Sequence, residues 1–242
     1  MSVDQVTDAL ESASKVAVKE IYFTGGEPFM HPEIFELIDR SLALAPLSIL
    51  TNGILIDDEV AQKLAQRFED SPYSFDLRVS LDGTTAAVND PIRGRGSFEK
   101  ILAGVCALAR AGINPVLTVT EVDDGANVHS RVAFKDLLVS LGLPKPRMKF
   151  LAPFRIGREE RRGRGYERYE MLEFEDILEG EEEALQCSSC RMVTAKGAYP
   201  CPILIEDESA RLGDSLEDAL KPITLKSRAC WTCHADGVSC RT

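Results

Sequence analysis

Cysteine is the residue of this sequence whose number and spacing most directly suggest chemistry. All but one of the seven cysteines fall in the tail of the chain, namely Cys187, Cys190, Cys201, Cys230, Cys233 and Cys240. Two pairs have the spacing CxxC, at which both sulfurs can reach one metal centre. Without a secretion signal, clustered cysteines more often bind metal than form disulfides. A set of thiolates suits zinc and an iron–sulfur cluster about equally. The remaining Cys106 lies in an apolar helical pattern and is predicted to be a small core residue.

A second stretch with chemical potential is GGEP, which directly follows an apolar run. Ile21–Phe23 is typical of a buried strand. Gly25 and Gly26 allow a ligand to approach the main chain closely. Glu27 then stands at the carboxyl end of that strand, where α/β folds bind their ligands, and Pro28 stiffens the exit. The pattern favours a ligand with a positively charged group. The alternative is a tight turn with a solvated Glu27.

Length and composition limit the class of protein. The 242 residues suit one large domain, or one domain with a small addition, and 44% hydrophobic and 28% charged residues are ordinary for a soluble protein. The formal net charge of -11 argues against a nucleic-acid partner. No apolar run approaches the roughly 20 residues that span a membrane, and the acidic amphipathic N-terminus is no secretory signal. We therefore expect a cytoplasmic protein without nucleic-acid or membrane partners.

The elements that must position these residues alternate between strand and helix over the first 150 residues. The strands are predicted at 20–24, 47–52, 76–83, 114–120 and 147–151, with helices at 3–13, 32–44, 57–68, 97–112 and 131–142. Ser97 is a suitable N-cap and Gly112 a suitable stop for one of these helices. This order indicates a parallel β/α series. Polar residues then fall at strand ends, which form the active face of a β/α barrel: Glu27, Asn52, Ser80, Asp82, Thr118 and Thr120.

The character of the sequence changes after Leu151. Six arginines fall within 155–168, and we interpret this stretch as a charged connector. The alternative is a contact with an anionic cofactor tail or an acidic peptide. The following residues, 170–185, are acidic on one side and apolar on the other, which predicts a surface helix through positions such as Phe174. A strand–turn–strand pattern around Gly197 leads to Cys201.

Together these motifs resemble radical S-adenosylmethionine (radical SAM) enzymes. The resemblance lies in YFTGGEPFMHP, TNG, RVSLDG, IRGRGSFEKILAGVCALARAGI and the cysteine tail, which is similar to the SPASM or twitch extension of peptide- and protein-modifying members. It implies an α/β fold with a partial (β/α)6 barrel at 1–152, a charged linker and helix at 153–186, and a small cysteine-rich α+β SPASM/twitch-like domain at 187–242.

The resemblance also implies roles for individual residues. Gly25, Gly26, Glu27 and Pro28 would contact the amino group of S-adenosylmethionine. Ser80 and Asp82 would lie near its ribose and carboxylate, and Arg93 would pair with the carboxylate, whose shape suits a guanidinium. The remaining residues that would line the cofactor side of the barrel are Asn52, Thr118 and Thr120.

For the tail, the resemblance implies an auxiliary 4Fe–4S cluster. The preferred ligands are Cys190, Cys201, Cys230 and Cys233, with Cys187 and Cys240 as alternates or as part of an incomplete second site. The implied activity is that of an iron–sulfur oxidoreductase or maturase. Such an enzyme cleaves S-adenosylmethionine to a 5′-deoxyadenosyl radical and modifies a peptide or protein substrate. Its electrons come from a reducing donor such as a flavodoxin or ferredoxin.

The sequence departs from the pattern of the family in three respects. The CxxxCxxC motif that holds the catalytic cluster does not occur, so no catalytic residue is identified. Five strands are predicted where the family barrel has six, which would leave 20–24 as an apolar edge. We therefore expect a fragment, or a start at an internal methionine, that is inactive alone. Asn89 stands where many relatives have histidine.

Two other hypotheses remain open. A catalytically dead barrel could bind a partner and use its cysteine tail as a structural or electron-carrying site. A zinc-stabilised β/α protein without a cofactor could use the same thiols. Iron with sulfide, or zinc, bound to the tail would distinguish them.

Overall fold

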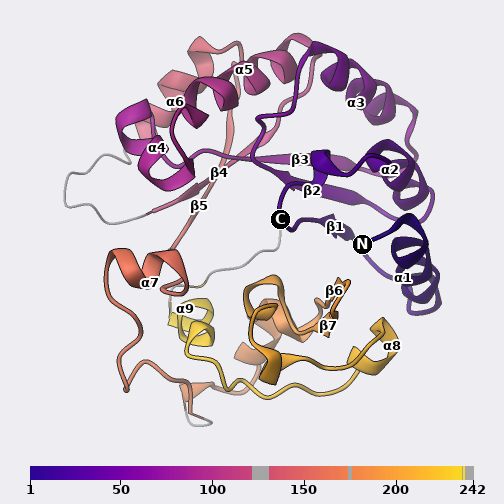
Figure 1. The fold of residues 1–242 in the computed structure, drawn as a ribbon, viewed down its shortest axis with the longest axis vertical. Coiled ribbons are helices and arrows are strands. Elements are labelled where there is room, and N and C mark those ends of the chain that lie inside the picture. Colours follow the sequence, from indigo (N-terminus) through magenta and orange to yellow (C-terminus); the bar gives the residue numbers. More distant parts are fainter. Residues whose placement is uncertain (122–130, 174–175, 236, 238–242) are drawn as a thin grey trace. The chain divides into compact units, whose positions relative to one another are not determined.

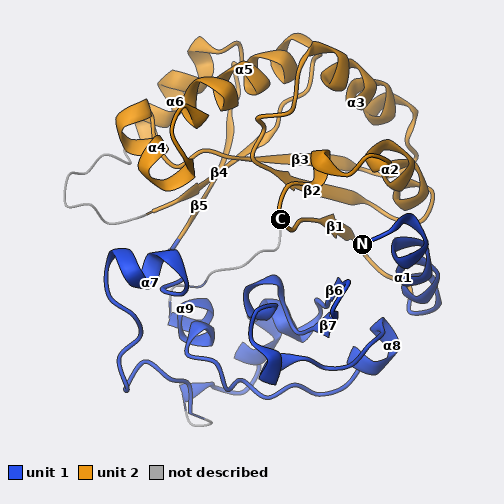
Figure 2. Cartoon of the chain, viewed as in Figure 1, with its two compact units in different colours: residues 1–16, 152–242 blue, residues 17–151 orange. Residues whose placement is uncertain are grey.

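The computed structural model describes residues 1–121, 131–173, 176–235 and 237. The chain divides into two compact units (Figure 2). Unit 2 comprises residues 17–151, and unit 1 comprises residues 1–16 together with 152–242. No helix in the described part of the chain is long and apolar enough to cross a membrane.

Unit 2 is built on a five-stranded sheet whose neighbouring strands all run parallel. The strands lie side by side in chain order: β1 (Ile21–Phe23), β2 (Leu47–Thr51), β3 (Phe75–Ser80), β4 (Val116–Thr120) and β5 (Arg147–Leu151). The sheet agrees with the sequence prediction. Because all five strands are parallel, their carboxyl ends lie along one edge of the sheet, and the residues that follow them can form one site.

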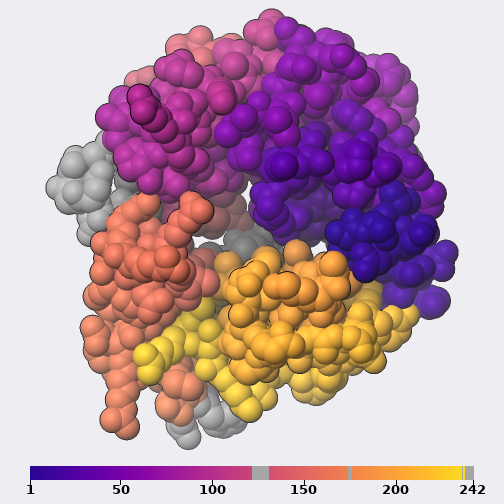
Figure 3. Space-filling model, viewed as in Figure 1, coloured from indigo at the N-terminus to yellow at the C-terminus, as the bar shows by residue number. Residues whose placement is uncertain are grey.

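The connections between the strands contain helices, which form the arc outside the sheet in Figure 1. They are η1 (Pro28–Met30), α2 (Ile34–Leu42), α3 (Asp58–Asp70), α4 (Ala86–Arg93), α5 (Ser97–Arg110) and α6 (Arg131–Ser140). Their apolar side chains and one face of the sheet form a single core around residues such as Ile49, Leu77 and Leu117, all 0% exposed. In the space-filling view the purple and magenta residues of this unit pack as one dense body (Figure 3).

Unit 1 consists of short elements. These are α1 (Val3–Lys15), α7 (Arg158–Arg162), η3 (Glu181–Ala184), η4 (Gln186–Ser188), β6 (Met192–Thr194), β7 (Gly197–Tyr199), η5 (Pro202–Leu204), η6 (Glu208–Ala210), α8 (Leu216–Ala219) and α9 (Ala229–Ala235). Strands β6 and β7 form an antiparallel hairpin, as the pattern around Gly197 predicts. Lys15 of α1 lies 3.8 Å from Glu217 of α8, so the first helix belongs to this unit.

Three local predictions differ from the structure. Residues 170–173 and 176–185 form turns and the short helix η3, so a surface helix is wrong for these residues, and Phe174 lies outside the described residues. Like charges run through Glu181–Glu183, and Gly180 has a positive φ of 91°, both unfavourable for an α-helix. The N-cap of α5 is Gly96 and not Ser97. Helix α4, which contains Pro91, was not predicted.

Cys106 is partly buried in α5 and does not belong to the core, so that prediction also needs correction. Its position is on the helix face that is only half covered. Gly112 follows α5 with a φ of 79°, which confirms it as the stop of this helix.

Candidate cofactor and metal sites

Glu27 ties the end of β1 to the end of β2. Its Oε1 accepts a hydrogen bond from Thr51 Oγ1 at 2.7 Å, and its Oε2 accepts one from the backbone N–H of Asn52 at 2.7 Å. The N–H of Phe29 donates to Oε1 at 3.1 Å, so the carboxylate also caps η1. A carboxylate offers about four lone-pair positions, and these three bonds orient it firmly. Glu27 is therefore a structural brace of the strand ends as well as a negative charge beside them.

The glycines before Glu27 leave open space next to the main chain. Gly25 has a φ of 128°, which residues with side chains rarely adopt. A Cβ placed on Gly25 or Gly26 would meet no atom within 4 Å, and both residues are exposed. Among the described residues, neither glycine makes a backbone hydrogen bond. The turn therefore presents peptide groups that a ligand can reach.

A second group forms around Asp82, which follows β3 and is 1% exposed. Arg93 Nε donates to Asp82 Oδ2 at 2.6 Å, and the N–H of Thr120 donates to Oδ1 at 2.8 Å. Both carboxylate oxygens are thus used within the protein. The two terminal nitrogens of Arg93 have no partner within the described residues, and its side chain is 27% exposed. Arg93 can therefore hold Asp82 and still offer N–H groups to an anion.

Asn89 fixes the loop that carries Asp82. It is fully buried, its Oδ1 accepts from the Asp82 N–H at 3.1 Å, and its Nδ2 donates to Ser97 Oγ at 3.0 Å. Next to it, Asp90 accepts from the N–H groups of Gly96 and Phe98, which lowers the pKa of its carboxyl below the ordinary value. This explains how α5 begins without a Ser97 cap. The residue that departs from the family pattern is thus a positioning residue.

The remaining predicted residues lie at the same edge with simpler roles. Ser80 and Thr118 are opposite each other on β3 and β4, so their side chains share one face of the sheet. Thr118 Oγ1 is buried and has no hydrogen-bond partner among the described residues. Asn52 uses its Oδ1 to accept from the Ile54 N–H at 2.9 Å, as in a local turn.

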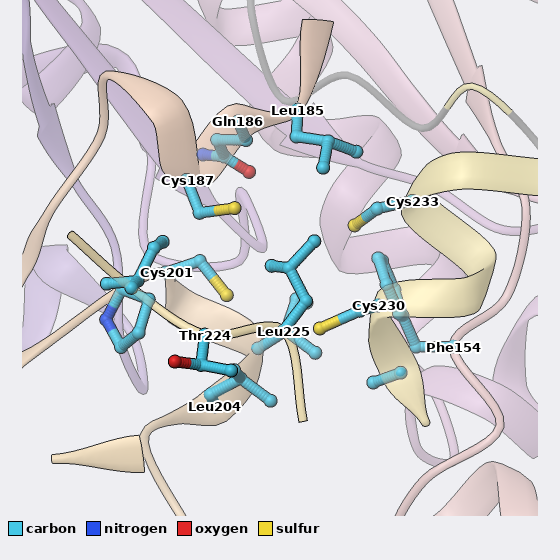
Figure 4. Close-up of a pocket in the computed structure, with 14 residues that line it drawn as sticks. Phe154, Leu185, Gln186, Cys187, Cys201, Leu204, Thr224, Leu225, Cys230 and Cys233 are labelled. Carbon is cyan, nitrogen blue, oxygen red and sulfur yellow. The ribbon is translucent and has the colours of Figure 1, made fainter. Parts of the chain in front are cut away.

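Four thiols of unit 1 converge on one pocket. Figure 4 shows the sulfurs of Cys187, Cys201, Cys230 and Cys233 pointing toward a common space. The other residues around it are mainly apolar, among them Phe154 and Leu185. Within the described part of the chain, no three Cys, His, Asp or Glu groups lie close enough to hold one metal ion. The thiols thus surround a space without forming a finished site for a single ion.

Burial disfavours the thiolate form of three of these cysteines. It is the main cause that raises the pKa of Cys201 to about 12, and the nearby Cys187 and Cys230 contribute in the same direction. Burial likewise raises the pKa of Cys187 and of Cys230. A bound cation would favour the thiolates, since metal ligation requires their deprotonated form.

One of the four preferred ligands lies apart from the other three. Cys190 does not line the pocket, and its sulfur accepts a hydrogen bond from Gln186 Nε2 at 3.6 Å. Arg191 fixes the turn between the two thiols, because its Nη1 donates to the carbonyls of Cys187 and Cys190 at 2.7 and 2.6 Å. Its other nitrogens bind the carbonyls of residues 219 and 221. Cys240 lies outside the described residues.

The family is shown by sequence comparison. The profile of the radical SAM superfamily matches residues 1–138, more than half of the chain, and the chain therefore belongs to this superfamily. Enzymes of the superfamily use S-adenosylmethionine and 4Fe–4S clusters. The matched residues contain the Glu27 and Asp82 groups described above.

Individual relatives agree with this assignment. The chain is 36% identical over 140 residues to the mycofactocin maturase MftC of Mycobacterium tuberculosis. The aligned region covers 54% of this chain and 34% of that protein. The chain is 32% identical over 142 residues to the AdoMet-dependent heme synthase of Nitratidesulfovibrio vulgaris, covering 56% and 35%. The chain thus spans about a third of the length of these curated relatives.

Solved structures show the same fold. SuiB of Streptococcus suis bound to S-adenosylmethionine has a TM-score of 0.55 at 15% identity, covering 93% of this chain and 60% of SuiB. SuiB bound to the precursor peptide SuiA has a TM-score of 0.52 at 15% identity, covering 69% and 36%. At this identity the similarity is one of fold.

The roles of several site residues escaped the sequence interpretation, although Asn89 stands out there as a departure from the family pattern. Thr51 and Asn89 act through hydrogen bonds to Glu27 and to the Asp82 loop, which depend on strand pairing. Arg191 binds carbonyls from two separate segments. The only local signal in the sequence is proximity, because each of these residues lies within a few positions of a residue that is predicted to bind a cofactor or a metal.

Proposed function

We propose that this protein is part of a radical SAM maturase that modifies a peptide substrate. The observation that carries the proposal is the open GGEP turn beside the Glu27 brace, within a sequence that matches the superfamily. The name of MftC and the precursor peptide bound to SuiB support a peptide substrate. When bound and reduced by one electron, S-adenosylmethionine would supply the hydrogen-atom abstraction that starts the modification of the substrate.

The residues at the strand ends fit S-adenosylmethionine. The peptide groups of Gly25 and Gly26 and the charge of Glu27 would receive its ammonium group, because both glycines are exposed and the half-buried carboxylate lies beside them. The terminal nitrogens of Arg93 would bind its carboxylate, with Asp82 holding the guanidinium in place. Ser80 would lie toward the ribose. Asn52, Thr118 and Thr120 would line the same side, and the protein's part is to orient the cofactor and exclude side reactions.

The residues do not fit a catalytic 4Fe–4S cluster. These 242 residues contain no CxxxCxxC, and Cys106 stands alone in α5. We therefore derive no step through that cluster, and we propose that this chain by itself does not cleave S-adenosylmethionine. In the complete reaction a one-electron donor such as a flavodoxin or ferredoxin would be required.

The tail fits an auxiliary 4Fe–4S cluster of the SPASM/twitch type. Four cysteine thiolates are the usual ligands of such a cluster, and Cys187, Cys201, Cys230 and Cys233 already face one pocket. The apolar wall would keep water from the cluster. Zinc is the alternative, because the same four thiolates suit it chemically.

Metal and cofactor analysis of the chain tests this proposal. After purification and reconstitution without oxygen, we expect roughly four irons and matching sulfide per chain, as for one 4Fe–4S cluster. Equilibrium dialysis should show binding of S-adenosylmethionine, and dithionite should yield no 5′-deoxyadenosine. Stoichiometric zinc with little iron would contradict the cluster. Absent binding of S-adenosylmethionine would contradict the strand-end site and favour a binding module.

A further inference from the structure

The arginine-rich stretch after β5 encloses a buried carboxylate. Glu170 is 5% exposed and accepts from two guanidinium groups at once. Arg155 donates to its two oxygens at 2.6 and 2.9 Å, and Arg164 donates to the same oxygens at 2.7 and 3.1 Å. Charge-assisted pairs in this two-pronged geometry are among the strongest hydrogen bonds in proteins. Two of the six arginines of this stretch therefore pair with a buried carboxylate.

Tyr166 lies at the centre of this structure. The Arg155 guanidinium stacks over its ring, with Cζ 4.4 Å from the ring centroid. The Arg155 N–H donates to the phenol oxygen at 3.2 Å, and that oxygen lies 2.6 Å from Thr232 Oγ1. Arg228 Nη1 adds a bond of 3.3 Å to the Tyr166 carbonyl. We name Arg155, Arg164, Tyr166 and Glu170 the arginine knot.

The contact with Thr232 brings the arginine knot to the cysteines. Thr232 is 1% exposed and lies on α9 between Cys230 and Cys233, both of which line the pocket. Phe154, directly before Arg155, lines the pocket as well. Helix α9 has only seven residues, and a helix of that length is not stable by itself. Its place in the unit must come from contacts such as the one to Tyr166.

We propose that the arginine knot is a positioning device for the metal centre, in which the Tyr166 hydroxyl holds α9 so that Cys230 and Cys233 face the pocket. This rests on the proposed function, because it takes the four thiols as metal ligands. Tyr166 acts through Thr232 and is a positioning residue. This role accounts for the arginine-rich stretch without an anionic cofactor tail or an acidic peptide as its partner.

The test compares two tyrosines of the same stretch. Tyr166→Phe removes the hydroxyl but keeps the ring under Arg155, so the fold should persist. Tyr169→Phe removes a hydroxyl from a side chain that is 72% exposed and serves as the matched control. Thr232→Val removes the other partner of the bond, and Thr232→Ser keeps it.

The readouts are the rate of iron release to a ferrous chelator without oxygen and the electron paramagnetic resonance spectrum of the reduced protein. We expect T232V to release iron about fivefold faster, the effect of losing one hydrogen bond, and to shift the spectrum. Y166F should be at least as fast, because it also leaves the Arg155 N–H without its acceptor. Y169F and T232S should match the unmodified chain. The double variant Y166F/T232V should be no faster than Y166F, because Y166F has already lost the bond that T232V removes.

Three results would overturn the proposal. The first is Y166F behaving like Y169F. The second is fully additive effects in the double variant, which would mean that the two residues act separately. The third is a chain that holds neither iron nor zinc, which overturns the proposed cluster and the role of the arginine knot together. If the unmodified chain holds zinc, the proposed cluster fails, but zinc release to a chelator tests the arginine knot in the same way.

Discussion

Thr51 and Glu27, at the carboxyl ends of two neighbouring strands, are joined by a hydrogen bond of 2.7 Å from Thr51 Oγ1 to Glu27 Oε1. The strand that precedes Glu27 has only three residues and lies at the edge of the sheet. So short a strand needs support beyond its backbone pairing. The carboxylate provides it, and in doing so it holds the glycine turn where a cofactor would bind.

Replacing this carboxylate should affect stability and ligand binding together. In Glu27→Gln an NH2 group would face the donors of Thr51 or Asn52, so one of them loses its acceptor. We expect a loss of about 1–3 kcal/mol in the free energy of unfolding, measured with urea. Equilibrium dialysis should show weaker binding of S-adenosylmethionine. Glu69→Gln, at an exposed position of α3, is the control. Equal behaviour of the two variants would refute the brace.

The sequence predicted the strands and the residues at their ends but not how those residues contact one another. Buried, β-branched runs define strands locally, and Glu27 and Asp82 follow from their position after such runs. The bond from Thr51 to Glu27 depends on the pairing of β1 with β2, which no local pattern reveals. Likewise, Glu170 is recognisable as buried only once two arginines surround it.

For a similar reason the sequence could not show that Cys187 faces the pocket and Cys190 does not. CxxC spacing treats both thiols alike. The turn that separates them is set by Arg191, whose other bonds go to carbonyls far along the chain. Helix α4 was not predicted; it has eight residues and contains Pro91, a residue that disfavours a helix interior.

Arg93 offers a way to separate structural support from cofactor binding. Arg93→Lys retains a cation beside Asp82 but loses the planar fork that suits a carboxylate. We expect little change in unfolding and a clear loss of affinity for S-adenosylmethionine. Arg93→Met should lose both, with about 2 kcal/mol of stability, because Asp82 is buried and keeps only the Thr120 N–H. Arg95→Met, at an exposed position nearby, controls for the lost charge. Full binding by the lysine variant would exclude the role of the fork.

The arginine knot predicts a dependence of stability on pH. Hydrogen bonds from Arg164 first, and from Arg155, hold the pKa of Glu170 far below its ordinary value of 4.5. In the unfolded chain the carboxyl returns to that value. Its stabilisation is therefore complete above about pH 4.5 and is lost as the pH falls below it, because only the unfolded state then takes up the proton.

Glu170→Gln removes the pH-dependent stabilisation that this carboxylate provides. The free energy of unfolding of the unmodified chain should fall more steeply between about pH 5.5 and pH 3.5, one unit either side of the ordinary carboxyl value of 4.5, than that of the variant. The two chains should differ most at neutral pH. Glu173→Gln, at an exposed position three residues along, should retain the steep fall. Parallel curves for the unmodified chain and E170Q would show that Glu170 is not specially stabilised.

The two thiols of the first CxxC should differ in their importance for the metal centre. Cys187 lines the pocket, and its sulfur points toward the other three thiols (Figure 4), whereas Cys190 does not line it and accepts a hydrogen bond from Gln186. Cys187→Ala should therefore lower the iron and sulfide content of the reconstituted chain well below half of that of the unmodified chain. It should also alter the absorption spectrum of the iron that remains bound. Cys190→Ala is the matched control, because it removes the same atoms from the same turn. It should keep the iron and sulfide content and the spectrum unchanged, because Cys190 does not line the pocket. The measurement is iron and sulfide per chain, together with the absorbance near 400 nm, roughly where iron–sulfur clusters absorb. If Cys190→Ala loses the cluster and Cys187→Ala keeps it, the ligand preferred on sequence grounds is the right one, and the turn held by Arg191 must reverse when metal binds.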